Sequence, residues 1–138
     1  MFVSVHFNSA RPDRGPSGIE TYCLTPAGAP STGNSEARIS NYQLNPGNRR
    51  DAHNILLSYC VQQALVQNLE AADRGVRRAR FVVIKETSKP AILVECGFLS
   101  NLSEQSRIRT PAYREKLAQS ICKGIKKFIG HVSPKKRS

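Results

Sequence analysis

Two segments with helical periodicity alternate with short strand-like runs, and this alternation limits the folds that the chain can adopt. Apolar side chains recur at every third or fourth position and predict helices over residues 51–72 and 112–130. Four runs alternate or stay apolar, as strands do, at residues 2–6, 18–24, 80–85 and 91–95. Strands interleaved with helices predict an α/β fold in one domain, with a mainly parallel sheet flanked by helices.

The connection between the second strand and the first long helix is unusually long. Residues 25–50 are dense in Pro, Gly, Ser and Asn, and connections of this length are usually functional or disordered. We expect this stretch to be the least ordered internal segment, with a short helical piece around residues 36–42. Further along the chain, Asn101 and Glu104 have capping-box spacing, and Thr110 precedes a proline that suits a first helical turn.

The chain is strongly basic. Its 21 Lys and Arg residues against 10 Asp and Glu residues give a net charge of +11. Such a charge favours anionic partners, namely nucleic acid, an acidic lipid surface or an anionic wall polymer. The apolar runs are far shorter than the roughly 20 residues of a transmembrane helix, so we expect no transmembrane segment.

Two polar side chains stand where predicted strands end, and ligands of parallel α/β sheets bind outside such ends. His6 ends the first strand, and Glu95 closes the apolar run of residues 91–94. Buried glutamates are rare unless they are paired or bound, so Glu95 indicates a functional group. We expect His6 and Glu95 to face each other across a shallow pocket at the carboxyl edge of the sheet. Glu20, in the second strand, is interpreted as part of a solvated outward face.

Five segments resemble, in the same order, those of the zinc-dependent N-acetylmuramoyl-L-alanine amidases of the amidase 3 family. They are residues 2–8 (FVSVHFN), 18–22 (GIETY), 74–81 (RGVRRARF), 90–101 (PAILVECGFLSN) and 111–118 (PAYREKLA). The most specific is residues 90–101, which resemble the catalytic-glutamate signature of the family. The resemblance covers nearly the whole chain.

The resemblance implies a peptidoglycan hydrolase that cleaves the amide between N-acetylmuramic acid and the L-alanine of the stem peptide. In the family, Zn2+ is held by two histidines and one glutamate, and a second glutamate assists the chemistry. His6 matches the later zinc histidine, Glu95 matches the assisting glutamate, and Asn8 matches a polar position that suits a substrate contact. Glu20 matches a family position without an assigned role. The implied partners are the stem peptide and glycan of peptidoglycan, in the periplasm or the extracellular cell envelope.

The chain departs from the family at two zinc ligands. The first zinc histidine, in a His-Gly turn, and the zinc glutamate both precede, in the family, the strand that begins this chain. Residues 1–130 therefore resemble roughly the last two-thirds of the catalytic domain, without its first strand and helix, and residues 131–138 form a basic tail. His53 and His131 are not expected to replace the missing ligands. The chain alone is expected neither to bind zinc tightly nor to hydrolyse peptidoglycan.

Three functions remain open on the sequence. The first is an amidase that is active only as a complete domain. The second is a zinc-free, inactive relative that binds wall peptides. The third is a basic nucleic-acid-binding domain, which is disfavoured because the chain has no nucleic-acid motif and no series of aromatic residues for base stacking.

Overall fold

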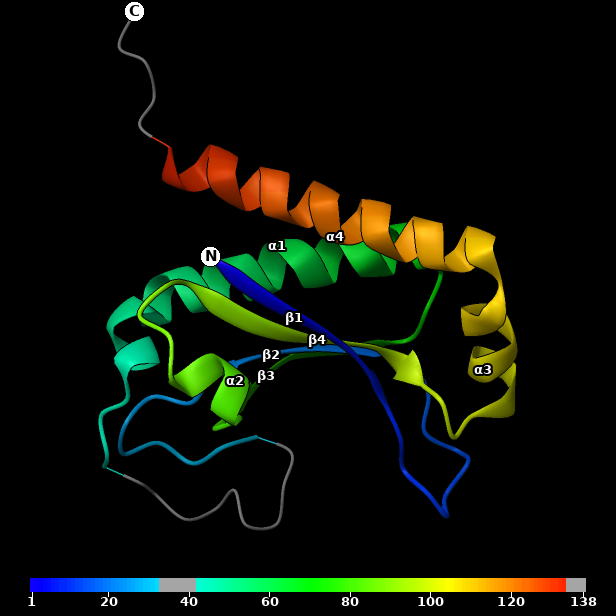
Figure 1. Ribbon diagram of the computed structural model, residues 1–138, viewed down its shortest axis with the longest axis horizontal. Coiled ribbons are helices and arrows are strands. Elements are labelled where there is room, and N and C mark those ends of the chain that lie inside the picture. Colours follow the sequence, from blue (N-terminus) through cyan, green and yellow to red (C-terminus); the bar gives the residue numbers. More distant parts are fainter. Residues whose placement is uncertain (33–41, 134–138) are drawn as a thin grey trace, which may run out of the picture.

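The computed structural model describes residues 1–32 and 42–133 (Figure 1). The strands of the sheet are β1 (Phe2–Asn8), β2 (Ile19–Leu24), β3 (Asp73–Ala79) and β4 (Ala91–Phe98). The helices are a 3-10 helix η2 (Pro46–Arg50), α1 (Asp51–Leu69), α2 (Val82–Lys85), α3 (Leu102–Arg109) and α4 (Pro111–Val132). The helical piece expected at residues 36–42 falls almost entirely outside the described residues, so the expected low order of residues 25–50 stays a prediction.

The strands form one sheet in the order β1-β4-β2-β3. The pairs β1–β4 and β2–β3 are parallel, whereas β2 runs antiparallel to β4. The predicted α/β fold with a sheet flanked by helices is therefore confirmed, with one antiparallel pair that makes the sheet mixed. The edge position of β3 explains its many arginines, because edge strands tolerate charged side chains that central strands do not.

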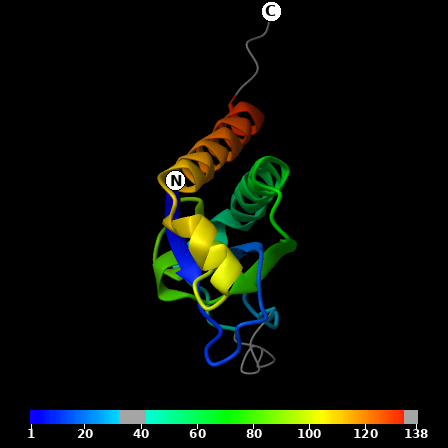
Figure 2. The same ribbon diagram turned by 90° about the vertical axis from the view of Figure 1, so that its right-hand side faces the viewer.

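Helices α1 and α4 lie side by side across one face of the sheet (Figures 1 and 2). The apolar stripes predicted for the two long helices are buried there, with Ile125 partly buried: Leu57, Val61, Leu65, Leu69, Leu117, Ile121 and Phe128. The core also takes the β4 side chains that face the helices, including Ile92 and Val94. The two helices approach closely at Gly124, where an added Cβ would lie 2.5 Å from the Cα of Val61.

The prediction of a strand over residues 80–85 is wrong. The strand is Asp73–Ala79, and Val82–Lys85 is the short helix α2 on the opposite face of the sheet from α1 and α4 (Figure 1). Only Ile84 of the apolar run is buried, against Tyr22 and Leu93, while Val82 is 65% exposed. A short apolar run fits a buried strand or a helix turn equally well, and periodicity alone does not separate them.

The other element ends differ from the predictions by a few residues. The first long helix stops at Leu69 rather than residue 72, because Glu70 takes a left-handed conformation with φ 52°. The last helix runs to Val132, so its final turn includes residues expected in the basic tail, of which residues 134–138 lie outside the described part. Both predicted N-caps are present: Asn101 accepts from the Glu104 N–H, and Thr110 accepts from the Tyr113 N–H. The capping box is not completed, because the Asn101 N–H donates to the Phe98 carbonyl oxygen.

Within the described residues, no helix is long and apolar enough to cross a membrane. An apolar groove of about 350 Å³ does open between β1 and α4, where Val5 and Phe7 face Leu117 and Ile121. It lies on the helix-covered side of the sheet. The opposite face, which α2 covers only in part, carries the polar side chains described next.

Candidate active site

Three polar residues form a row across three neighbouring strands. His6 on β1 pairs in register with Glu95 on β4, and Glu95 pairs in turn with Glu20 on β2. Residues directly opposite on neighbouring strands point to the same face of a sheet. That face is the one away from α1 and α4, because Glu95 alternates with Val94 and Cys96, which pack into the helix-covered core. The structure thus brings His6 and Glu95 side by side.

The row lies near the carboxyl ends of β1 and β4 but not at them. β1 continues to Asn8 and β4 continues to Phe98, each beyond the residue expected to end it. The expected shallow pocket around the pair stays a prediction. The difference arises because the pairing of β1 with β4 continues through an irregularity between His6 and Asn8 instead of stopping at the histidine.

Glu95 has the properties of a reactive carboxyl group. Its side chain is half-buried, and its Oε2 atom is buried without a hydrogen-bond partner in the described part of the chain. Burial, and then the nearby charge of Glu20, raise the pKa of the Glu95 carboxyl to about 7. A buried carboxyl oxygen left without a partner is uncommon in folded proteins, and a shifted pKa of this kind is frequent at functional sites.

Glu20 is not part of a solvated outward face, as the sequence suggested, but is 2% exposed. Its Oε1 accepts from Asn8 Nδ2 at 3.0 Å and from the Tyr22 hydroxyl at 2.8 Å. Its Oε2 lies 2.9 Å from Arg74 Nε and 3.0 Å from Arg77 Nε. Burial, followed by the hydrogen bond to Glu20, raises the pKa of the Tyr22 phenol. Both oxygens of Glu20 are therefore occupied by protein groups.

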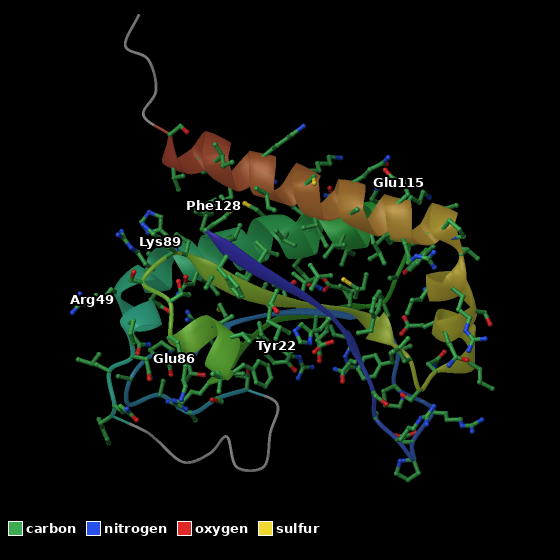
Figure 3. All side chains as sticks on the ribbon, in the orientation of Figure 1. Tyr22, Arg49, Glu86, Lys89, Glu115 and Phe128 are labelled. Atoms are coloured by element: carbon green, nitrogen blue, oxygen red, sulfur yellow. The ribbon has the colours of Figure 1, made fainter. Side chains whose placement is uncertain are left out.

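Sequence reasoning missed the two arginines and Tyr22 as members of this site. The alternation of Glu20 with Tyr22 on one strand placed them on a common face and was the available signal. The arginines gave no such signal because their segment was expected to precede the strand rather than to form it. Figure 3 shows Tyr22 on the side of the sheet away from α4.

The other expected site residues have these positions. His6 is exposed, with Nε2 2.9 Å from the Ser4 hydroxyl. The Asn8 amide donates to Glu20 and accepts from the Ser9 N–H, so its substrate contact stays a prediction. His53 stacks edge-on against Phe128 on the helix-covered side, with ring centroids 6.3 Å apart, remote from the row.

The loop beside the row is tied to β4 and α3. The buried Glu104 carboxylate accepts from the Gly18 N–H at 2.9 Å and from the Phe98 N–H at 2.6 Å. Gly97 has φ +130° and lies against Glu104, where a Cβ would meet Oε2 at 3.3 Å. Glu104 therefore fixes the start of β2 against the end of β4, which sets the positions of Glu20 and Glu95.

The metal-ligating side chains among the described residues do not fit the zinc ion that the resemblance implies. Across residues 1–32 and 42–133, no group of three or more His, Cys, Asp or Glu side chains is placed to hold a metal ion. A catalytic zinc takes three protein ligands. His6 supplies one imidazole, and the oxygens of Glu20 are already occupied. We therefore derive no step through zinc from these residues.

Comparison with known proteins agrees with the fold and with the sequence pattern. A family model described as N-acetylmuramoyl-L-alanine amidase matches residues 1–127. The N-acetylmuramoyl-L-alanine amidase LytC of Bacillus subtilis is 34% identical over 124 residues, which are 90% of this chain and 20% of LytC. The AmiC amidase of Escherichia coli is 29% identical, over 94% of this chain and 36% of AmiC.

Solved structures give the same result. The N-acetylmuramoyl-L-alanine amidase from Clostridium difficile 630 superposes with a TM-score of 0.73 at 27% identity, over 95% of this chain and 58% of that one. The chain thus spans little more than half of that solved structure and a fifth of LytC. With the family model matching nearly its full length, the chain belongs to the amidase 3 family of N-acetylmuramoyl-L-alanine amidases.

Proposed function

We propose that this chain acts in a peptidoglycan hydrolase that cleaves the amide between N-acetylmuramic acid and the L-alanine of the stem peptide. The observation that carries the proposal is the half-buried Glu95, with one oxygen unpartnered in the described structure, inside the segment that matches the family's glutamate signature. The substrate is polymeric and anionic, which suits a chain of net charge +11. The site of action is the periplasm or the extracellular cell envelope, where peptidoglycan lies.

Glu95 is the residue that moves the proton. With a pKa of about 7, both its protonated and its ionised forms are populated near neutral pH. A carboxyl group with this property takes a proton from an attacking water and returns it to the leaving nitrogen, a contribution of about 10²–10⁴ in rate. Glu20 has a different role, because the groups around it hold both its oxygens.

The potential metal ligands among the described residues favour a second function, the binding of wall peptides without cleavage. The described residues offer His6 but no three-ligand metal group, and this suits a relative that binds wall peptides without cleaving them. The two functions share the binding face and differ in turnover. Cleavage by the complete family site would be zinc-dependent, with His6 as one of its ligands.

The test separates the two functions with a chimera. This chain replaces the segment of LytC that it matches, so that the rest of an amidase surrounds Glu95. Stem peptides released from purified peptidoglycan are measured by mass spectrometry. We expect release by the chimera and a loss of about 10²–10⁴-fold in Glu95→Gln.

Glu115→Gln is the matched control, because Glu115 is exposed on α4 and hydrogen-bonds only Gln119 among the described residues (Figure 3). Release that is equal in Glu95→Gln and in the parent chimera would overturn the role of Glu95. A folded chimera that binds peptidoglycan and never releases peptides would support the binding function instead.

A further inference from the structure

Two arginines of the edge strand β3 lie on the same face as Glu95, and a bulge is the reason. Residues three apart in a regular strand, such as Arg74 and Arg77, point to opposite faces. Here the pairing steps from Ile19–Asp73 to Thr21–Val76, so β3 contains one more residue than β2 over this stretch. Gly75 takes φ +82° at the extra position, which glycine adopts without strain. Both arginines consequently reach Glu20.

The arginines carry more charge than Glu20 neutralises. Two guanidinium groups share the single oxygen Oε2 of Glu20, and each uses its Nε atom for that contact. Together with Glu20, the two arginines therefore carry one excess positive charge. A structural ion pair would need only one arginine for one carboxylate.

The two arginines are held to different degrees. Arg74 stacks over the Phe98 ring, 4.9 Å from its centroid, and its Nη1 lies 3.5 Å from the Ser17 carbonyl oxygen. Arg77 donates through Nε to the Arg74 carbonyl oxygen, while the same Nε lies 3.0 Å from Glu20 Oε2 as an ion pair. Its terminal nitrogens have no hydrogen-bond partner among the described residues. Its side chain is 30% exposed. Arg77 thus offers the end of a preoriented guanidinium to solvent.

We propose that Arg74 and Arg77 form a subsite that binds a free carboxylate of the stem peptide, beyond the amide that is cleaved at Glu95. The choice of a wall peptide rests on the proposed function, whereas the preference for a carboxylate rests on the arginines. Guanidinium and carboxylate groups match in planar, two-bonded geometry, so a carboxylate is the fitting ligand.

The spacing agrees with a peptide laid across the strands. β3 lies two strands from β4, and neighbouring strands are about 4.8 Å apart, so the arginine backbones are roughly 10 Å from that of Glu95. Their guanidinium groups reach back to Glu20 on β2, one strand from β4, and so lie nearer to Glu95 than their backbones do. An extended peptide covers about 3.3–3.6 Å per residue. A carboxylate on the second or third residue of the stem peptide therefore reaches the arginines while the first amide lies at Glu95.

The test measures binding and needs no cleavage. The full chain is titrated by calorimetry with N-acetylmuramoyl-L-alanyl-D-glutamate and with the same compound carrying both glutamate carboxyls as amides. We expect the diacid to bind about tenfold more tightly or better, since hydrogen bonds between charged groups are stronger than neutral ones. In Arg77→Gln the ratio of the affinities for the diacid and the diamide should fall towards one, and thermal melting checks that the variant is folded.

Arg49→Gln, which removes the same charge from an exposed position far from Tyr22, should keep the preference (Figure 3). Arg77→Lys keeps the charge near Glu20 and should keep part of the preference for the diacid. This second variant keeps the test usable if Arg77→Gln does not fold. Equal binding of the two compounds, or binding of neither, overturns the subsite. A preference for the diacid that survives Arg77→Gln also overturns the subsite. Glycerol 3-phosphate is titrated as a phosphate ligand, and tighter binding of it than of the diacid overturns the choice of a carboxylate. A chimera that fails to cleave while this preference holds refutes the hydrolase alone.

Discussion

Glu20 and Glu95 stand directly opposite each other on the antiparallel strands β2 and β4. Like charges in this arrangement repel, and the two carboxylates differ in the groups that surround them. Glu20 is matched by two arginines, whereas burial and the charge of Glu20 raise the pKa of Glu95. One carboxylate is thereby fixed as structural charge, and the other is the group able to exchange a proton near neutral pH.

Stability should depend on pH through Glu95, and Glu95→Gln should remove that dependence. The pKa of Glu95 rises from 4.5 to about 7 on folding, so the folded chain binds more protons between these values. The free energy of unfolding therefore falls as pH rises through this window and stays lowered above it. Glu95→Gln should match the parent near pH 4 and exceed its stability at pH 8.

Urea unfolding at several pH values checks this expectation. Glu115→Gln serves as the control and should follow the parent at every pH. A stability advantage of Glu95→Gln that is constant from pH 4 to pH 8 would contradict the raised pKa.

Glu20→Gln should destabilise the chain and lower the pKa of Glu95. The amide keeps the shape of Glu20 but leaves Arg74 and Arg77 without a counter-charge, at a cost of about 1–3 kcal/mol, since both arginines are partly screened by solvent. Removing the charge also removes one of the two causes that raise the pKa of Glu95. Carboxyl carbon NMR across a pH titration reports the pKa, and an unchanged value would show that Glu20 does not act on Glu95.

The sequence predicted the helices better than the strands, for a physical reason. The stripes of α1 and α4 repeat over several turns, and each repeat adds to the same signal. The run before Glu86 is only one turn long, so its apolar residues fit α2 or a strand. The arginine-rich β3 has no alternating apolar pattern, because an edge strand tolerates charged side chains.

Only part of the site was predicted, and the reason is related. Glu95 stood out because a carboxylate after four apolar residues is costly to bury alone. Glu20 is more deeply buried than Glu95, but its arginine partners come from β3, more than 50 residues later in the chain. A pairing over such a separation, and a bulge that turns both arginines to one face, depend on strand order and register. Neither is visible in the local sequence.

Gly124→Ala should destabilise the chain, and Gly130→Ala on the same helix should not. An added Cβ at Gly124 would lie 2.5 Å from Val61 Cα and 2.8 Å from the Cys60 carbonyl oxygen, so α4 must move away from α1. Overpacking of this kind costs about 1–3 kcal/mol. At Gly130 nothing lies within 4 Å, and the alanine should stabilise by about 0.4–1 kcal/mol. Chemical unfolding of both variants gives the two values, and a Gly124→Ala variant as stable as the parent would refute the close packing at Gly124.

The chain alone should not hold zinc stoichiometrically. A catalytic zinc needs three protein ligands, and among the described residues His6 has no second and third donor grouped with it. Equilibrium dialysis followed by metal analysis should therefore find well under one zinc per chain. His6→Ala should leave that value unchanged, whereas in the LytC chimera the same substitution should reduce bound zinc. Stoichiometric zinc in the chain alone, with stem-peptide release that a chelator abolishes, would show that other residues of this chain complete the site.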